Sequence, residues 1–215
     1  MSTPLAQVAF WRSGLLLGLI ALLGVALLVG VHDLTRARIA EQEHQLMMQQ
    51  LSEVLPRSYY DNDLVSDVTT LTDRGAFGHD RPIRIFRARR EGQPSAVIME
   101  VVAPDGYNGD IRLLAGIDRD NTITGVRVVS HRETPGLGDP IERRRSDWIE
   151  SFRGRSLQDP SLERWTVRSE GGDFEQFTGA TITPRAVVHA LARALAYHEQ
   201  RSDKIFAREA DRDDA

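Results

Sequence analysis

The sequence has 215 residues, 27 of them basic and 31 acidic, for a formal net charge of -4. The basic residues are interspersed with the acidic ones, so no basic face predicts binding to nucleic acid. The absence of cysteine excludes disulfides, thiolate catalysis and iron–sulfur clusters held by cysteine. A redox role would therefore need an organic cofactor or a metal site without thiolates.

Histidine is the remaining strong metal ligand, and its positions are scattered. No His-Glu-x-x-His pair occurs, so we expect no metal site. The six histidines are His32, His44, His79, His131, His189 and His198.

An uncharged apolar run covers residues 14–31. It is long enough to span a bilayer, and no clear small-x-small cleavage site follows it. We expect residues 1–32 to form a short tail and an uncleaved transmembrane anchor that contacts membrane lipid through 14–31. A cleaved signal peptide is the alternative. Arg12 precedes the run and Arg36 and Arg38 follow it, so charge does not decide the orientation.

Residues 33–56 contain no glycine, and their apolar side chains recur loosely at helical spacing. We predict a stalk helix here, ended by Leu55-Pro56. The following Tyr59-Tyr60-Asp61-Asn62-Asp63 lacks the glycine and distal glutamate of a calcium loop, so it is interpreted as a turn.

A soluble domain is expected over 57–202, and its centre has the pattern of β-strands. The candidate strands are short, rich in β-branched residues and separated by turn clusters. Neighbouring strands at this spacing pair antiparallel, so the predicted fold class is α+β, with a mainly antiparallel sheet and flanking helices. The candidate strands are 83–87, 96–102, 111–117 and 123–129.

Two glycine-containing loops follow or separate these strands. Gly106-Tyr107-Asn108-Gly109 permits a tight turn and could present the Tyr107 ring to a planar ligand. The loop 131–140, His-Arg-Glu-Thr-Pro-Gly-Leu-Gly-Asp-Pro, lets the backbone approach a ligand closely. It does not match a dinucleotide or phosphate-loop motif.

After Asp139-Pro140 a helix is predicted, with one apolar face and an end at Gly154. That face consists of Ile141, Trp148, Ile149 and Phe152. A further short strand is predicted over 165–168. No Gly-x-Ser-x-Gly elbow or other nucleophile motif occurs, so hydrolase chemistry has little support.

The run Phe177-Thr178-Gly179-Ala180-Thr181-Ile182-Thr183-Pro184 is a polar loop that leads into a helix. We expect Thr183 to cap that helix and Pro184 to take its first position. The unpaired amides of a first helical turn favour an anion such as phosphate. Helix capping alone is the alternative. The helix is expected to run to about Gln200, before a charged tail over 203–215.

Three of these pieces together resemble the FMN-binding domain of the G subunit of the Rnf (also called Rsx) electron-transport complex. They are Gly106-Tyr107, Glu133-Thr134-Pro135-Gly136-Leu137-Gly138 and Thr178-Gly179-Ala180-Thr181. The resemblance covers nearly the whole chain, including the single N-terminal anchor. The C subunit of the sodium-translocating NADH:quinone reductase is the related alternative.

The resemblance implies a covalent flavoprotein of the bacterial inner membrane, with its domain in the periplasm. FMN would be joined to Thr181 by a phosphoester bond, attached by a separate magnesium-dependent flavin transferase. The flavin would relay electrons between membrane subunits of the complex, coupled to ion movement or to reduction of a redox sensor, with no catalytic residue of its own. The family usually has aspartate six residues before the modified threonine, where this sequence has Glu175.

The predicted flavin-binding residues come from the matching positions. Tyr107, Thr134 and Leu137 are the candidates for contact with the isoalloxazine ring. The full expected set is Thr181, Thr178, Gly179, Ala180, Thr183, Tyr107, Glu133, Thr134, Leu137 and Gly138. An anchored scaffold or sensor domain, with the threonine loop serving only as a helix cap, is the alternative from a different class.

Overall fold

The structure is a computed structural model that describes residues 17–19, 21–25, 27–30, 41–42 and 44–207. It divides into two compact units, Met1–Leu46 and Met47–Ala215. Parts of the predicted anchor and stalk lie outside the described residues, and the described parts are helical. Within those described ranges, no helix has both the length and the apolar character needed to cross a membrane.

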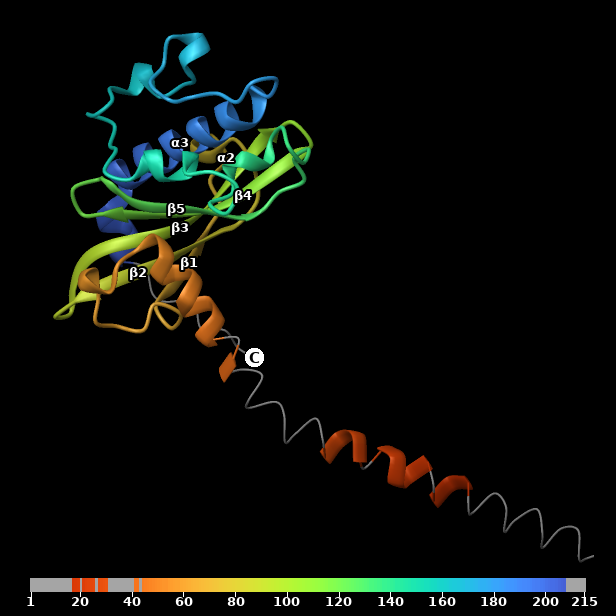
Figure 1. Ribbon diagram of the computed structural model, residues 1–215. Helices are drawn as coiled ribbons and strands as arrows, with labels where there is room; N and C mark the ends of the chain where they lie inside the picture. Colours follow the sequence, from red (N-terminus) through yellow and green to blue (C-terminus); the bar gives the residue numbers. More distant parts are fainter. Residues whose placement is uncertain (1–16, 20, 26, 31–40, 43, 208–215) are drawn as a thin grey trace, which may run out of the picture. The chain divides into compact units, whose positions relative to one another are not determined.

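The second unit is built on one five-stranded antiparallel sheet (Figure 1). Its strands follow the chain in spatial order, as a simple meander. The predicted α+β domain with an antiparallel sheet is confirmed. The four predicted strands are present and longer than expected, and a first strand was missed. The strands are β1 (Val68–Leu71), β2 (Ile83–Arg90), β3 (Gln93–Gly106), β4 (Gly109–Asp118) and β5 (Ile123–Ser130).

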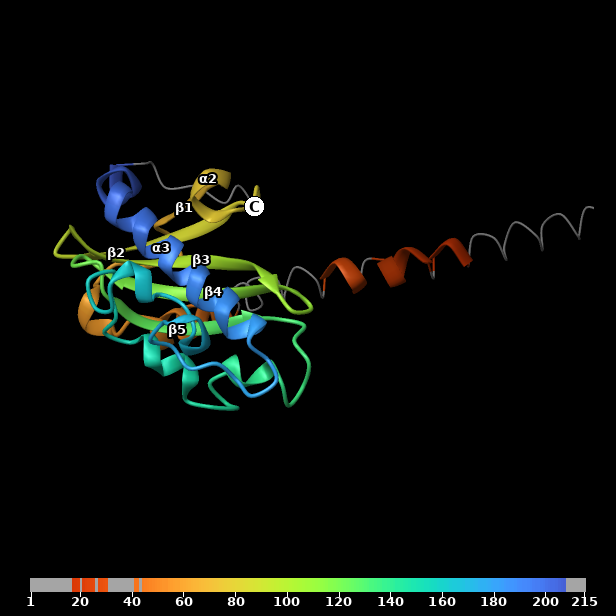
Figure 2. The ribbon, with the colours of Figure 1, turned by 90° about the horizontal axis from the view of Figure 1, so that it is seen from above.

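Side chains along a strand alternate between the two faces of the sheet, and both faces carry buried apolar side chains. Each face is therefore covered by another part of the chain. The long helix α3 (Ile182–Ala207) crosses one face (Figure 2), where it packs on residues such as Ile85, Met99 and Leu113. Residues 47–64 pack on the opposite face against Phe86, Ile98 and Leu114. The sheet is therefore the middle layer of the domain.

The helix that ends at Val54 approaches the sheet closely because two glycines face it. A Cβ atom on Gly116 would lie 2.6 Å from the Val54 carbonyl oxygen, and one on Gly125 would lie 2.8 Å from it. The Thr124 hydroxyl donates to that same oxygen over 2.6 Å. This contact fixes the segment before the domain's first strand onto the sheet.

The predicted helix after Asp139-Pro140 is wrong in form. The structure has two short 3-10 helices instead, η2 (Asp139–Ile141) and η3 (Trp148–Phe152). Ser146 separates them, since its hydroxyl donates to the Pro140 carbonyl over 2.7 Å and accepts from the Trp148 amide over 3.1 Å. The apolar spacing was still informative, because Ile141, Ile149 and Phe152 are fully buried.

The predicted strand over 165–168 is also wrong. Within the described residues this stretch forms one isolated bridge, between Val167 and Phe174, flanked by η4 (Leu162–Arg164) and η5 (Arg168–Glu170). The Trp165 ring packs 4.9 Å from that of Phe174, and its indole nitrogen donates to the Pro160 carbonyl over 3.1 Å. The Trp165 side chain thus holds this stretch in place, whereas the prediction assigned that role to strand pairing. The remaining short elements are η1 (Arg57–Tyr59) and α2 (Arg74–Phe77).

Helix α3 extends beyond its predicted end near Gln200, to Ala207. Its last carbonyl groups find partners on β2: Arg87 donates to the Ile205 carbonyl over 3.2 Å, and Arg89 donates to the Phe206 carbonyl over 3.5 Å. These bonds satisfy acceptors that a helix end leaves without partners. The opposite end of α3 borders the site described next.

Candidate functional site

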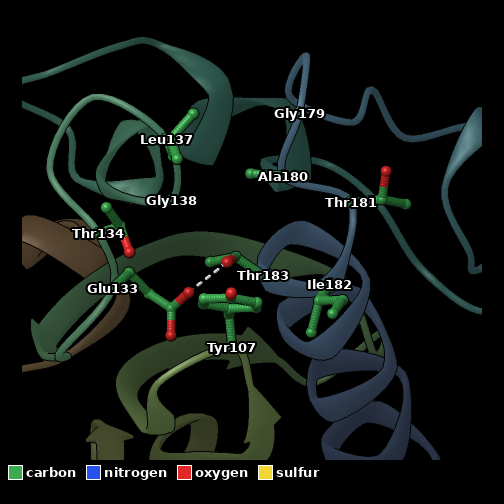
Figure 3. Close-up of a pocket in the computed structure, with 10 residues that line it drawn as sticks. All are labelled: Tyr107, Glu133, Thr134, Leu137, Gly138, Gly179, Ala180, Thr181, Ile182 and Thr183. Carbon is green, nitrogen blue, oxygen red and sulfur yellow. Dashed lines mark hydrogen bonds between the residues drawn. The ribbon is translucent and has the colours of Figure 1, made fainter.

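A cavity of about 340 Å³ lies at the N-terminal end of α3 (Figure 3). Three segments surround it: the β3–β4 turn, the loop over 133–138, and the loop that enters α3. Its lining residues are Tyr107, Glu133, Thr134, Leu137, Gly138, Gly179, Ala180, Thr181, Ile182 and Thr183.

The loop before α3 is shaped by a tight turn. The Ala180 amide donates to the Phe177 carbonyl over 3.1 Å, and Gly179 has a φ of 80°, which a residue with a side chain rarely adopts. Trp148 holds the start of this loop: its ring lies 5.2 Å from that of Phe177, and its indole nitrogen donates to the Glu175 carbonyl over 2.8 Å. The threonines that follow are thus presented from a fixed base.

Helix α3 begins earlier than the sequence predicted. The first helical residue is Ile182, and the Thr181 carbonyl accepts from the Arg185 amide over 3.2 Å. Thr181 therefore occupies the capping position that we predicted for Thr183, and Pro184 lies inside the first turn. The first turn itself carries no acidic side chain, but the Glu133 carboxylate contacts its Thr183 hydroxyl, and Pro184 has no amide hydrogen to donate. The amides of Ile182 and Thr183 are the first-turn donors that favour an anion.

The Thr183 side chain has a different task from the predicted cap. It is 1% exposed, and its hydroxyl donates to Oε2 of Glu133. The other carboxylate oxygen of Glu133 accepts from the Asn108 amide over 3.1 Å. A Cβ atom on Gly138 would lie 2.9 Å from both Glu133 Oε2 and Thr183 Oγ1, so this glycine leaves room for the pair. Glu133, itself 5% exposed, links all three segments.

The 134–138 segment is a compact turn. The amides of Leu137 and Gly138 both donate to the Thr134 carbonyl, over 3.1 and 3.0 Å. The Gly136 amide donates to Asp139 Oδ1 over 2.6 Å. The Thr134 hydroxyl accepts from the Asn108 side chain over 3.1 Å, which ties this turn to the β3–β4 turn.

The cavity rim carries apolar side chains that are exposed to solvent. Tyr107 is 65% exposed, Leu137 45% and Ile182 43%. They come from three separate segments and meet around one cavity. Such a convergence of apolar surface on a cavity with polar groups in its floor is typical of a site for an organic ligand.

Nine of the ten predicted flavin-binding residues line this cavity. Thr178 does not; it lies on the turn before it. Ile182 lines the cavity and was missed, because the predicted helix began after it. The Thr181 side chain points away from the Glu133–Thr183 hydrogen bond, toward the outside of the loop (Figure 3). Glu175 is 62% exposed and forms an ion pair with Arg168.

Comparison with known proteins matches two sequence families: an FMN-binding domain over residues 106–196, and the RnfG N-terminal region over residues 1–54. The G subunit of the ion-translocating oxidoreductase complex of Vibrio atlanticus is 44% identical over 93% of this chain and 95% of that protein. The corresponding Pseudomonas aeruginosa protein is 48% identical over 92% of each chain. The chain belongs to the RnfG family of ion-translocating oxidoreductase subunits.

The cavity lies within the part of the chain that matches the FMN-binding domain. Every lining residue, from Tyr107 to Thr183, falls inside the segment that matches the FMN-binding domain. Residues 1–54, which contain the apolar run, match the RnfG N-terminal region. The sequence resemblance to the Rnf complex is thereby confirmed.

Proposed function

We propose that this chain is a covalent flavoprotein that carries FMN on Thr181 and relays electrons within a membrane complex. The observation that carries the proposal is the cavity: the Thr181 loop, the Tyr107 turn and the Glu133–Gly138 loop converge on it. Membership of the RnfG family supports the electron-transport role.

The residues present fit the chemistry of FMN. The ring system is flat and largely apolar, and it would be held by Tyr107, Leu137 and Ile182 at the rim. The phosphate is anionic, and Thr181 directly precedes the first-turn amides of α3. Thr134 and Glu133 add polar groups for the edge of the ring. The set therefore offers partners for the face and edge of the ring and for the phosphate.

Attachment requires an accessible hydroxyl rather than a reactive cavity. A transferase would bring a flavin pyrophosphate donor to the outer side of the loop. The Thr181 hydroxyl oxygen would bond to the flavin-side phosphorus, the second phosphate would leave with the rest of the donor, and the hydroxyl proton would pass to a base of the transferase. Gly179 and Ala180 keep the approach clear of large side chains.

Bound FMN would supply electron transfer in single steps, which no side chain of this cysteine-free chain provides. The protein's own residues position and shield it. Tyr107, Leu137 and Ile182 exclude water from the ring, while Thr183 and Asn108 hold the Glu133 carboxylate in the cavity floor. No side chain is assigned an independent catalytic step.

The proposal includes a place for the protein in the cell. Residues 14–31 would anchor it in the inner membrane of a bacterium, with the FMN domain in the periplasm and the other members of the complex as partners. The match of residues 1–54 to the RnfG N-terminal region supports this assignment. A reporter fused after Ala215 tests it: activity of a cytoplasmic reporter alone would contradict the periplasmic location.

The covalent link is tested by co-expressing the chain with its flavin transferase. The denatured wild-type band should fluoresce under ultraviolet light, and its mass should rise by one FMN less one water. Thr181→Ala should abolish both signals, while Ser169→Ala, at an exposed hydroxyl on η5 outside the cavity, should retain them. A dark wild-type band beside an active transferase would support the scaffold alternative. A fluorescent Thr181→Ala band would overturn only the attachment site.

A second measurement separates this proposal from the quinone-reductase alternative. Purification of the complex through a tag on this chain should bring down the other subunits of an ion-translocating oxidoreductase complex, identified by mass spectrometry. Recovery of NADH:quinone reductase subunits instead would reject the assignment to the Rnf complex.

A further inference from the structure

His131 lies two residues before Glu133 and does not line the cavity described above. It lines a second, polar cavity of about 480 Å³. Asn108 also borders that second cavity, and its amide and side chain contact the Glu133–Thr134 segment. Residues 131–134 therefore run along the chain from the lining of the second cavity into the lining of the first.

The imidazole of His131 is fixed by a contact at each nitrogen. Nδ1 lies 3.1 Å from the Glu133 backbone nitrogen, whose N–H donates to it. Nε2 lies 2.8 Å from Oε1 of Glu142. Because Nδ1 accepts a hydrogen bond, it carries no proton, so the hydrogen of the neutral ring is on Nε2 and donates to Glu142. The contacts thus select one tautomer.

Glu142 is a firmly held acceptor for this hydrogen. Arg144 donates to its Oε1 over 3.1 Å and also contacts Oε2. The hydrogen bond from Arg144, with a smaller one from His131, lowers the pKa of Glu142 to about 2. Glu142 therefore stays ionised at neutral pH and orients the imidazole.

The same imidazole holds the backbone of Glu133, whose side chain is held from the other direction. Thr183 donates to one carboxylate oxygen and the Asn108 amide to the other. Figure 3 shows the carboxylate directed toward Thr183 beneath the cavity. Hydrogen bonds therefore run from Arg144 through Glu142 and His131 to the Glu133 backbone amide, and a separate pair holds the Glu133 carboxylate.

We propose that His131, oriented by Glu142, is a positioning residue that fixes the Glu133 carboxylate beneath the bound flavin and so sets the flavin's reduction potential. The inference rests on the proposed FMN function. A negative charge held close to the ring opposes the arrival of an electron, and the opposition weakens when the charge moves away or gains water. His131 itself does not line the cavity proposed to hold FMN.

The tautomer is tested first, on the protein without flavin. Imidazole nitrogen-15 chemical shifts measured at neutral pH should show an unprotonated Nδ1 and a protonated Nε2 for His131. Glu142→Gln should weaken this preference, while His189→Leu, a half-buried histidine outside the cavity, should leave it unchanged. A protonated Nδ1 in the wild type would overturn the inference, whatever is found about the flavin.

The effect on the cofactor is tested on loaded protein by redox titration of the flavin absorbance. His131→Leu removes both contacts, and it should make the midpoint potential less negative and shift the flavin absorption bands. His131→Asn keeps an acceptor for the Glu133 amide, because its Oδ1 can take the place of Nδ1, and it should restore most of the wild-type potential. Glu142→Gln should produce a smaller shift in the same direction as His131→Leu.

The outcomes separate the two proposals. A wild type without covalent flavin rejects the proposed function. A loaded series in which wild type, His131→Leu and Glu142→Gln share one potential rejects the positioning role and leaves the flavin assignment intact. Should His131→Leu fail to fold, the His131→Asn and Glu142→Gln proteins still provide the comparison.

Discussion

Both ends of α3 leave backbone groups without partners inside the helix, and the two ends differ in what surrounds those groups. At the C-terminal end, Arg87 is 2% exposed, and it pairs with Asp67 over 2.5 Å while it donates to the Ile205 carbonyl. Arg89 also pairs with Asp67 over 2.8 Å, and its guanidinium lies 5.4 Å from the centre of the Phe206 ring. Charged side chains therefore satisfy the carbonyl groups of this helix end from within the protein.

The N-terminal end of α3 borders an open cavity instead. Its first turn has no acidic side chain, and the rim of the adjoining cavity consists of exposed Tyr107, Leu137 and Ile182. An internal hydrogen bond there, between Thr183 and Glu133, lies in the cavity floor. The C-terminal end is thus closed by internal ion pairs and hydrogen bonds, whereas the N-terminal end borders a cavity with exposed apolar side chains at its rim.

The largest effect is expected at the C-terminal end. Asp67→Ala removes the carboxylate beside a buried guanidinium, which should lower the free energy of unfolding by about 3 kcal/mol in chemical denaturation. The matched control is Asp147→Ala, whose carboxylate pairs with Arg143 but is 84% exposed, and it should change stability by less than about 0.5 kcal/mol. Equal effects of the two substitutions would contradict the contrast between the helix ends.

A second prediction concerns His198, which is 2% exposed and whose Nδ1 lies 3.0 Å from Asn121 Oδ1. Burial lowers its pKa from 6.5 to about 4. Between these values the unfolded chain binds a proton that the folded chain does not, so stability should fall as pH decreases through this window, by about 3 kcal/mol in total. Denaturation midpoints measured across the window should show a smaller slope for His198→Gln. An unchanged slope would rule out this histidine as the source.

The smallest effect on stability is expected at the cavity rim, where Leu137→Ser removes an exposed side chain. The free energy of unfolding should change by less than about 0.5 kcal/mol. Covalent flavin should persist, but its fluorescence anisotropy should fall because the ring loses a contact. Leu162→Ser, at an exposed leucine on η4 outside the cavity, is the control and should leave the anisotropy unchanged. A fall in both variants would argue against a specific rim contact.

The strands could be predicted because their signals are local. The β-branched residues between turn clusters located strands β2 to β5, and the predicted ranges were only shorter than the observed strands. Strand β1 was missed because Val68-Thr69-Thr70-Leu71 is brief and half polar, and its pairing with β2 supplies what its sequence does not. Helical spacing misled over 139–154, where the same residues are buried from two separate 3-10 turns.

In the candidate site, too, local motifs could be predicted from the sequence, whereas contacts between distant segments could not. The resemblance of the Thr178–Thr181 and Glu133–Gly138 motifs predicted nearly all of the cavity lining, but Ile182 was missed because the helix start was placed too late. The Thr183–Glu133 bond and the contact of Arg87 with Ile205 join segments far apart in sequence. No local sequence pattern predicts such a pair, so these contacts are found only in the folded structure.

The position of α3 at the end of the domain has a consequence for biosynthesis. The five strands are complete at Ser130, whereas the helix that covers one of their faces begins at Ile182. A chain that emerges from its N-terminus can therefore pair the whole meander, whose neighbouring strands need only short connections, before it can cover Ile85, Met99 and Leu113. During that interval an apolar sheet face is open to other chains. Truncation before α3 should consequently yield an aggregating product rather than a smaller soluble domain.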